Sequence, residues 1–88
     1  MLLRITGQVQ GVGYRHWAVR TAAGLDLRGW VRNRWDGSVE ALVIGAGEDV
    51  AAMIEACGHG PKAAQVREMT VAAEKDDGSA GFTARPTE

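Results

Sequence analysis

The apolar residues of this chain change spacing several times along its 88 positions, and that order constrains the fold more than any other feature. Leu3, Ile5 and Val9 alternate with polar residues, which predicts a half-buried strand over 2–9. Apolar side chains then recur at helical spacing over 14–25. The remaining predicted elements are a strand over 27–33, a strand over 38–45, a helix over about 48–57 and a strand over 63–71.

Turn and cap residues indicate where these elements end. The Asp-Gly pair at 36–37 tolerates positive φ and predicts a hairpin between the second and third strands. The acidic pair at 48–49 suits the N-terminus of the second helix, and Gly58 suits its C-terminal stop. Alternation slips near Glu68, which indicates a bulge in the fourth strand. The last expected segments are a polar loop at 74–81 and a short final strand at 82–85.

Two strand-helix-strand units joined by a hairpin predict an α+β fold, the ferredoxin-like βαββαβ sandwich, with an antiparallel sheet and two helices on one face. We expect a single domain over residues 1–88. A helical crossover makes the first and second strands parallel, so both end at the same edge of the sheet. With one strand between them, these ends lie about 10 Å apart. The segment 7–15 and Asn33 should therefore meet there.

The segment 7–15, GQVQGVGYR, contains three glycines and no carboxylate, and it ends in an arginine. Glycines let consecutive backbone N–H groups turn inward and form an anion-binding concavity. The start of a helix adds free N–H groups and a favourable dipole. Arg15 adds a guanidinium that can grip two phosphate oxygens. Together these features predict a site for phosphate or a similar oxyanion, although a glycine turn before a helix is common and weak evidence alone.

Composition restricts the partners. Lysine and arginine number 10 against 11 aspartates and glutamates, whereas a nucleic-acid binder usually carries a strong basic excess. No apolar run reaches membrane length, and the first residues lack the apolar core of a secretory signal. The single cysteine suits a reducing compartment. We therefore expect a cytoplasmic monomer that acts on a small molecule and binds neither nucleic acid nor a membrane.

Several side chains that could carry chemistry have simpler explanations. His16 and His59 have no partners at metal-ligand spacing and are expected at the surface, so we predict no metal site. Cys57 continues the apolar stripe of the second helix and is expected in the core. Three residues are expected to serve packing rather than base stacking: Trp17, Trp30 and Trp35. Three others form a basic patch that is either a solvated strand face or a means of steering anions: Arg28, Arg32 and Arg34.

Three blocks, GQVQGVGYR, GLDLRGWVRNRWDGSVEALVIG and GPKAAQV, resemble acylphosphatases in order and spacing from about Ile5 to Val71. The resemblance implies hydrolysis of an acyl phosphate to a carboxylate and inorganic phosphate, without metal or cofactor. It implies that Arg15 binds the phosphate and that Asn33 orients the attacking water. It also implies a phosphate cradle that Arg15 shares with the backbone of Gln8, Val9, Gln10, Gly11, Val12, Gly13 and Tyr14.

Two positions depart from the pattern of that family. Asp26 stands where the family usually has glycine, which puts local stability in doubt if its φ is positive. Gly13 stands where animal members often have an aromatic residue, which favours a looser cradle. The tail FTARPTE matches only loosely.

Other functions remain open to a ferredoxin-like chain. A phosphate-binding or regulatory module of the same fold that does not turn over is one alternative, and acylphosphatase-like domains also occur within larger hydrogenase-maturation proteins. An RNA-recognition sheet would need aromatic residues that the first and third strands lack. A metal chaperone of this fold would need a pair of cysteines.

Overall fold

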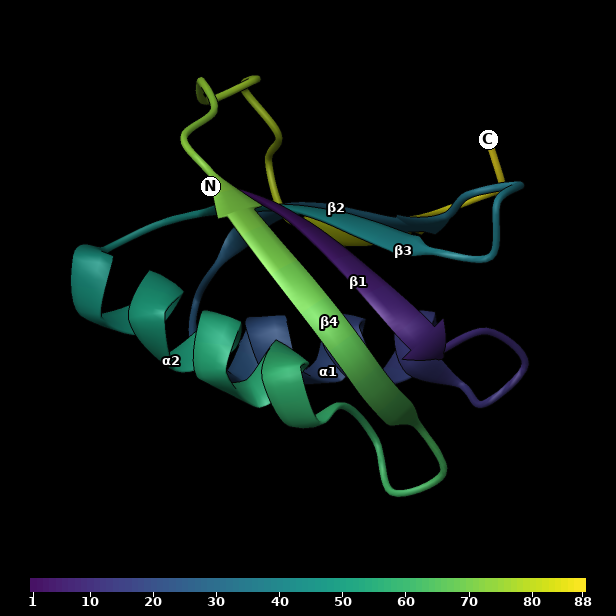
Figure 1. Cartoon of the computed structure of the whole chain (residues 1–88). Coiled ribbons are helices and arrows are strands. Elements are labelled where there is room, and N and C mark those ends of the chain that lie inside the picture. Colours follow the sequence, from purple (N-terminus) through teal and green to yellow (C-terminus); the bar gives the residue numbers. More distant parts are fainter.

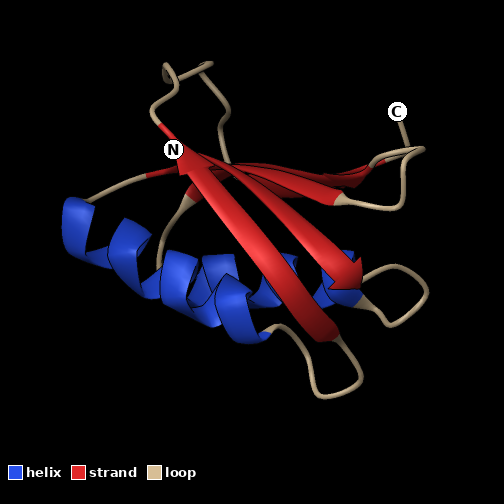
Figure 2. Cartoon of the chain, viewed as in Figure 1, coloured by secondary structure: helices blue, strands red, loops and turns tan.

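The computed structural model describes residues 1–88 and consists of a five-stranded sheet with both helices on one of its faces (Figures 1 and 2). The elements are β1 (Leu2–Gln8), α1 (Tyr14–Gly24), β2 (Arg28–Asn33), β3 (Val39–Ile44), α2 (Gly47–His59), β4 (Gln65–Ala72) and β5 (Phe82–Arg85). The other face of the sheet carries no helix and lies beside the loop between β4 and β5 (Figure 1). Each predicted helix and strand is therefore present in the predicted order.

The strand order is β4-β1-β3-β2-β5, and the first four strands pair antiparallel, which confirms the ferredoxin-like arrangement. One strand, β3, separates β1 from β2, and both pair antiparallel with it, so β1 and β2 run parallel as expected from the crossover rule. β5 adds a parallel pair at the edge, with Phe82 beside Gly29 and Arg85 beside Arg32. This pair is parallel because β4 finishes at the same end of the sheet at which β2 begins. From there the chain passes to the opposite outer position of the sheet, and β5 runs in the same direction as β2.

The core fills the space between the sheet and the helices. From α1 the fully buried residues are small, Ala18 and Ala22, whereas α2 contributes Met53 and Cys57. The strands contribute a further set of buried side chains: Leu3, Ile5, Val31, Val39, Ala41 and Val43. Cys57 is thus a core residue, as predicted, and burial raises the pKa of its thiol to about 11.

The predicted bulge lies at the end of β1. Pairing shifts between Thr6, which lies opposite Glu68, and Gly7, which lies opposite Val66, so Arg67 has no partner. Gly7 has a φ of 123°, and a Cβ atom there would come within 2.2 Å of the Gln65 carbonyl oxygen. Only glycine fits this position, and the bulge redirects the chain as it enters the segment that was predicted to bind an anion.

The two helix ends differ in how well the sequence predicted them. Asp26 follows α1 with a φ of 55°, which confirms the left-handed backbone considered for this position. The predicted stop of α2 at Gly58 is wrong, because the helix continues to His59 and its cap is Gly60, with a φ of 71°. Gly58 keeps a helical conformation, whereas Gly60 turns the chain and donates its N–H to the Ala56 carbonyl at 2.9 Å.

The three tryptophans occupy different environments. Trp30 is buried, and Trp17 packs on the core with its ring centre 5.2 Å from that of Tyr14 in an edge-to-face arrangement, so both serve packing as predicted. The prediction is wrong for Trp35, which is 82% exposed. Trp35 lies in the hairpin turn beyond the last β2–β3 pair, Asn33 with Val39, where the sheet offers nothing to cover its ring. His16 and His59 are exposed, as expected.

Candidate active site

A cleft of about 610 Å³ opens where the segment between β1 and α1 meets the end of β2. It contains both Arg15 and Asn33, so the two side chains that the sequence placed at one edge of the sheet do share a site. Five further members of the predicted cradle also line it: Val9, Gln10, Gly11, Gly13 and Tyr14. Gln8 and Val12 do not. Gln8 closes β1, and Val12 packs against the core.

The backbone of the segment is held open by glycine. Gly11 and Gly13 have φ values of 72° and 78°, a conformation that strains other residues, and Gly13 is the N-cap residue directly before α1. No side chain caps this helix, and no acidic residue lies in its first turn. The N–H groups of residues 9–16 donate none of the backbone hydrogen bonds, and the first helical bond runs from Trp17 to Gly13 at 3.0 Å. A row of donors is thus available to an anion.

Arg15 lies at the second position of α1, beside these donors. Its Nη1 donates to the backbone carbonyl of Arg85 at 2.9 Å, which ties α1 to the end of β5. Arg15 takes part in none of the six ion pairs of the structure. Its charge is therefore oriented by a neutral group and is not compensated by a carboxylate.

Asn33 is the last residue of β2. Its main-chain carbonyl accepts a hydrogen bond from the N–H of Glu88 at 3.0 Å. Its side-chain Oδ1 is buried and has no hydrogen-bond partner, the only such side-chain atom in the structure. Leaving a buried acceptor without a partner costs about 1–3 kcal/mol, so an atom of this kind calls for an explanation. Asn33 lines the cleft, so its amide lies near any group that enters there.

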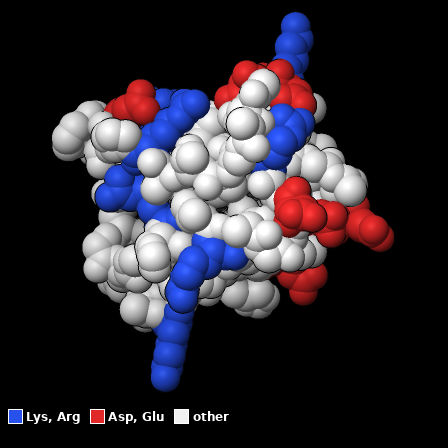
Figure 3. Space-filling view, turned by 180° about the vertical axis from the view of Figure 1, so that it is seen from behind, with Lys and Arg blue, Asp and Glu red and all other residues white.

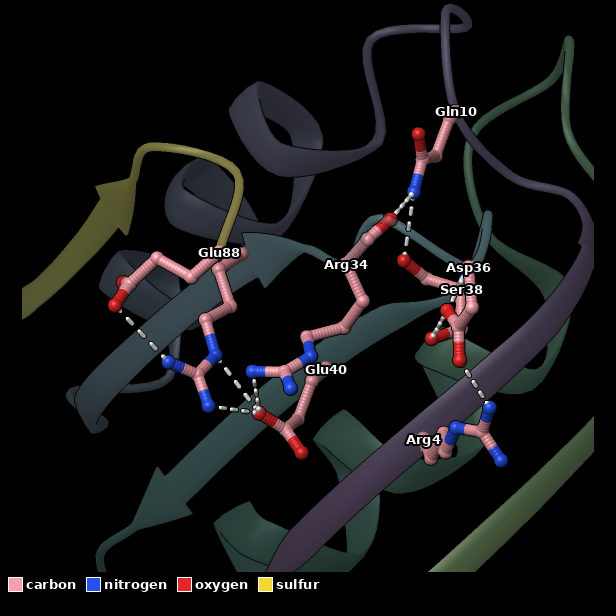
Figure 4. Close-up of polar contacts among 8 residues, drawn as sticks. Arg4, Gln10, Arg34, Asp36, Ser38, Glu40 and Glu88 are labelled. Atoms are coloured by element: carbon pink, nitrogen blue, oxygen red, sulfur yellow. Dashed lines mark hydrogen bonds and ion pairs between the residues drawn. The ribbon is translucent and has the colours of Figure 1, made fainter.

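Gln10 joins the glycine segment to the β2–β3 hairpin. Its Nε2 donates to the carbonyls of Arg34 and Ser38, at 2.8 Å in each case (Figure 4). The hairpin is itself braced by Asp36, which accepts hydrogen bonds from the hydroxyl and N–H of Ser38 and pairs with Arg4. These bonds, first those from Ser38 and then that from Arg4, hold the pKa of Asp36 well below its usual range.

Tyr14 anchors the start of α1. Its ring is buried, and its hydroxyl donates to the Cys57 carbonyl at 2.6 Å, which connects the two helices. Burial raises the pKa of this phenol far above its ordinary value, so the group stays neutral. The side chain of Tyr14 therefore has a structural role, and its backbone N–H is the part available to a ligand.

The predicted basic patch carries no surplus of positive charge. Arg28 pairs with Asp76, and Arg32 pairs with Glu40 at 2.6 Å. Arg34 lies 3.8 Å from the same Glu40 (Figure 4). Acidic side chains also lie beside basic ones at the upper edge of the molecule in Figure 3. The patch is compensated because Arg32 and Glu40 are direct partners across β2 and β3, a register that the sequence alone did not reveal.

Five lining residues of the cleft were not predicted as site residues. His16 and Val19 come from α1, and Phe82, Thr83 and Ala84 come from β5. The helical spacing of Val19 from Arg15 was available in the sequence, but the position of β5 was not. The structure contains no group of three or more His, Cys, Asp or Glu side chains that could hold a metal ion. Neither helix is long and apolar enough to cross a membrane.

The fold and the site together define a class: a ferredoxin-like sandwich with an oxyanion-binding cleft at one edge of its sheet. Comparison with known proteins narrows this class. Residues 1–84 match the family model described as Acylphosphatase. The acylphosphatase of Rhodospirillum rubrum is 49% identical over 87 residues, which cover 99% of this chain and 96% of that protein.

Solved structures agree with this result. The crystal structure of acylphosphatase from Bacillus subtilis superposes with a TM-score of 0.90 at 32% identity, over 97% of this chain and 99% of that one. Full-length HypF in a phosphate- and nucleotide-bound form also matches, with a TM-score of 0.85 at 27% identity, but only 12% of that chain is covered. The chain belongs to the acylphosphatase family. It is an enzyme that hydrolyses acyl phosphates.

Proposed function

We propose that Arg15 and the free N–H groups of the glycine segment bind the phosphoryl group of the substrate, and that Asn33 orients the water that attacks phosphorus. The observation that supports this division most directly is the shared cleft, which holds an uncompensated arginine and an unpaired, buried amide oxygen. The first suits an anion, and the second suits a donor such as water.

The chemistry asks for little beyond positioning and charge. An acyl phosphate already carries a good leaving group, because the departing oxygen becomes part of a carboxylate. Phosphoryl transfer through a loose transition state depends mainly on stabilising charge on the phosphoryl oxygens. Backbone N–H groups and a guanidinium do this without rearranging, since the glycine segment and the bond from Arg15 to the Arg85 carbonyl already hold them in place.

The bond changes can be assigned to these groups. The water oxygen forms a new bond to phosphorus while the bond from phosphorus to the acyl oxygen breaks, and the water proton passes to the phosphate. Asn33 is neutral at every relevant pH, so it holds the water through Oδ1 without removing its proton. Orientation of the attacking water supplies the rate gain that a general base supplies elsewhere.

Isotope labelling distinguishes attack of water on phosphorus from attack on the carbonyl carbon. Hydrolysis of acetyl phosphate in water enriched in heavy oxygen should put the label in inorganic phosphate and none in acetate. Label in acetate would show attack at the carbonyl carbon and would contradict the role of Asn33.

Metal dependence is a separate test. Because Arg15 and backbone N–H groups supply the positive charge, turnover should persist in EDTA.

The proposal also covers the compartment and the oligomeric state of the enzyme. We place it in the cytoplasm as a monomer, with the single domain spanning residues 1–88. The unpaired Cys57 and the single continuous core support this assignment. Sedimentation of the purified protein tests the monomer, and a dimer would contradict it.

A further inference from the structure

The cleft is larger than the part of the substrate that reacts. Its volume is about 610 Å³, whereas a phosphoryl group occupies the space of a few water molecules at about 30 Å³ each. Most of the cleft is therefore left for the acyl part of the substrate. What lines that remaining space decides which acyl groups fit.

The remaining space is bordered by apolar side chains from two elements. Val19 lies four residues after Arg15 on α1, which places it on the same face of the helix about 6 Å further along the axis. Phe82 and Ala84 lie two residues apart on β5 and share one face of that strand. We call the strip formed by Val19, Phe82 and Ala84 the acyl groove.

The geometry of β2 allows the acyl groove to form. Phe82 pairs with Gly29, and a Cβ atom at Gly29 would lie 3.5 Å from the Phe82 ring. The ring thus covers the glycine and packs partly on the core. Arg15 is the only Lys, Arg, Asp or Glu that lines the cleft. A charged acyl group on this strip would lose water against three apolar side chains, because the neighbouring polar lining residues, His16 and Thr83, are not part of the strip.

We infer that the acyl groove binds the acyl part of the substrate and that the enzyme prefers acyl phosphates with an uncharged, apolar acyl group. This inference rests on the proposed function, since it takes the phosphoryl group to lie beside Arg15. Each methylene that enters the groove is worth up to about fourfold in kcat/KM.

The first test is a substrate series. The ratio kcat/KM should rise from acetyl to propionyl to butyryl phosphate, and benzoyl phosphate should exceed acetyl phosphate. Succinyl phosphate, which has four carbons like butyryl phosphate but carries a carboxylate, should be the poorer substrate of that pair. A flat or falling series overturns the acyl groove. Failure to hydrolyse even acetyl phosphate would instead overturn the proposed function.

The second test changes polarity at constant shape. Val19→Thr keeps the branched side chain but adds a hydroxyl, and it should lower kcat/KM for benzoyl phosphate about threefold, a larger loss than for acetyl phosphate. Val71→Thr is the matched control, because Val71 is 43% exposed on β4 and does not line the cleft. Equal losses for both substrates in Val19→Thr would mean that Val19 supports the fold of the site, which contradicts the inference.

A second inference rests on different atoms, the two hydrogen bonds of Gln10. Its Nε2 bonds to the carbonyl of Arg34, the residue that directly follows Asn33, and to the carbonyl of Ser38 across the turn (Figure 4). Those two residues also bond to each other, since the Arg34 N–H donates to the Ser38 carbonyl at 2.8 Å. One side chain thus links the anion-binding segment to the rigid base of the hairpin that carries Asn33.

The structure assigns Gln10 a positioning role: its side chain sets the distance between the bound phosphoryl group and the water held by Asn33. Gln10→Met keeps the length of the side chain but removes the donor. It should lower kcat about tenfold while inorganic phosphate still inhibits at a similar concentration, because the backbone N–H groups of the segment remain.

A double-mutant cycle separates this role from simple stabilisation. In the background of Asn33→Ala, the change Gln10→Met should cause little further loss of kcat, because the oriented water is already lost. Thr21→Val is the control, since it removes a hydrogen bond to the Trp17 carbonyl within α1, away from the cleft, and should leave kcat unchanged. Additive losses in the cycle, or a Gln10→Met enzyme with lower thermal stability and normal kcat, would overturn the positioning role.

Discussion

Arg15 and Arg32 are both partly buried arginines, but carboxylates balance the charge of Arg32 and none balances that of Arg15. Arg32 pairs with Glu40 and Glu88 and lies 4.7 Å from the centre of the Trp30 ring, on the face of the sheet without helices. Arg15 bonds only to a backbone carbonyl, in the first turn of α1. A guanidinium with matched carboxylates holds the fold together, whereas one held by a neutral group keeps its charge for a ligand.

The largest effect should follow from removing the uncompensated charge. Arg15→Ala should lower kcat/KM by at least about 10³ and abolish competitive inhibition by inorganic phosphate, because the guanidinium contacts the anion before and during the reaction. Arg15→Lys should recover little, since an ammonium cannot reproduce a two-pronged grip. Steady-state kinetics and backbone amide shifts on phosphate titration measure both losses. Normal phosphate binding by a folded Arg15→Ala enzyme would contradict the contrast with Arg32.

Asn33→Ala should have a smaller and different effect. We expect kcat to fall by about 10² to 10³, as for the loss of one well-placed polar group, while phosphate binding persists. The reason is that Oδ1 is assigned to the water and not to the anion. Circular dichroism must first show that the variant is folded. If its turnover equals that of the parent, Asn33 only ends β2.

Arg32→Met should lower the stability of the fold and leave the activity nearly unchanged. It leaves Glu40, which is only 18% exposed, with Arg34 at 3.8 Å as its remaining partner. We expect a loss of about 1–2 kcal/mol in the free energy of unfolding, less than for a fully buried pair, with kcat/KM nearly unchanged. Denaturant unfolding and acetyl phosphate kinetics on the same sample decide this. A large loss of activity at unchanged stability would mean that the two arginines do not divide the work as described.

The smallest effect concerns the backbone beyond α1, which serves as a reference far from either arginine. Asp26 has a φ of 55°, a conformation that glycine adopts without strain. Asp26→Gly should raise the free energy of unfolding by up to about 1 kcal/mol and leave kinetics unchanged. A lower denaturant midpoint for the variant would show that the added freedom of the unfolded chain outweighs the relief of strain.

The sequence predicted those features of the site that depend only on the order and direction of the strands and helices. The meeting of Arg15 and Asn33 follows from one helical crossover and the place where each strand ends, so it needed no knowledge of side-chain packing. The environment of Trp35, the pairing of Arg32 with Glu40 and the cap at Gly60 depend on register and on neighbours distant in sequence. The acyl groove was missed for the same reason, because the parallel pairing that places β5 beside β2 cannot be read from a four-residue segment.

The position of β1 between two strands that come later in the chain also affects how the protein folds. β1 pairs on one side with β3 and on the other with β4, where Leu2 lies opposite Ala72. Pairing of segments so far apart in the chain slows folding relative to a helical protein of equal size. During synthesis one side of β1 stays unpaired until β4 has left the ribosome. The hydrogen bond from Arg15 to the carbonyl of Arg85 forms later still. A nascent chain should therefore gain enzymatic activity only after Arg85 has left the ribosome.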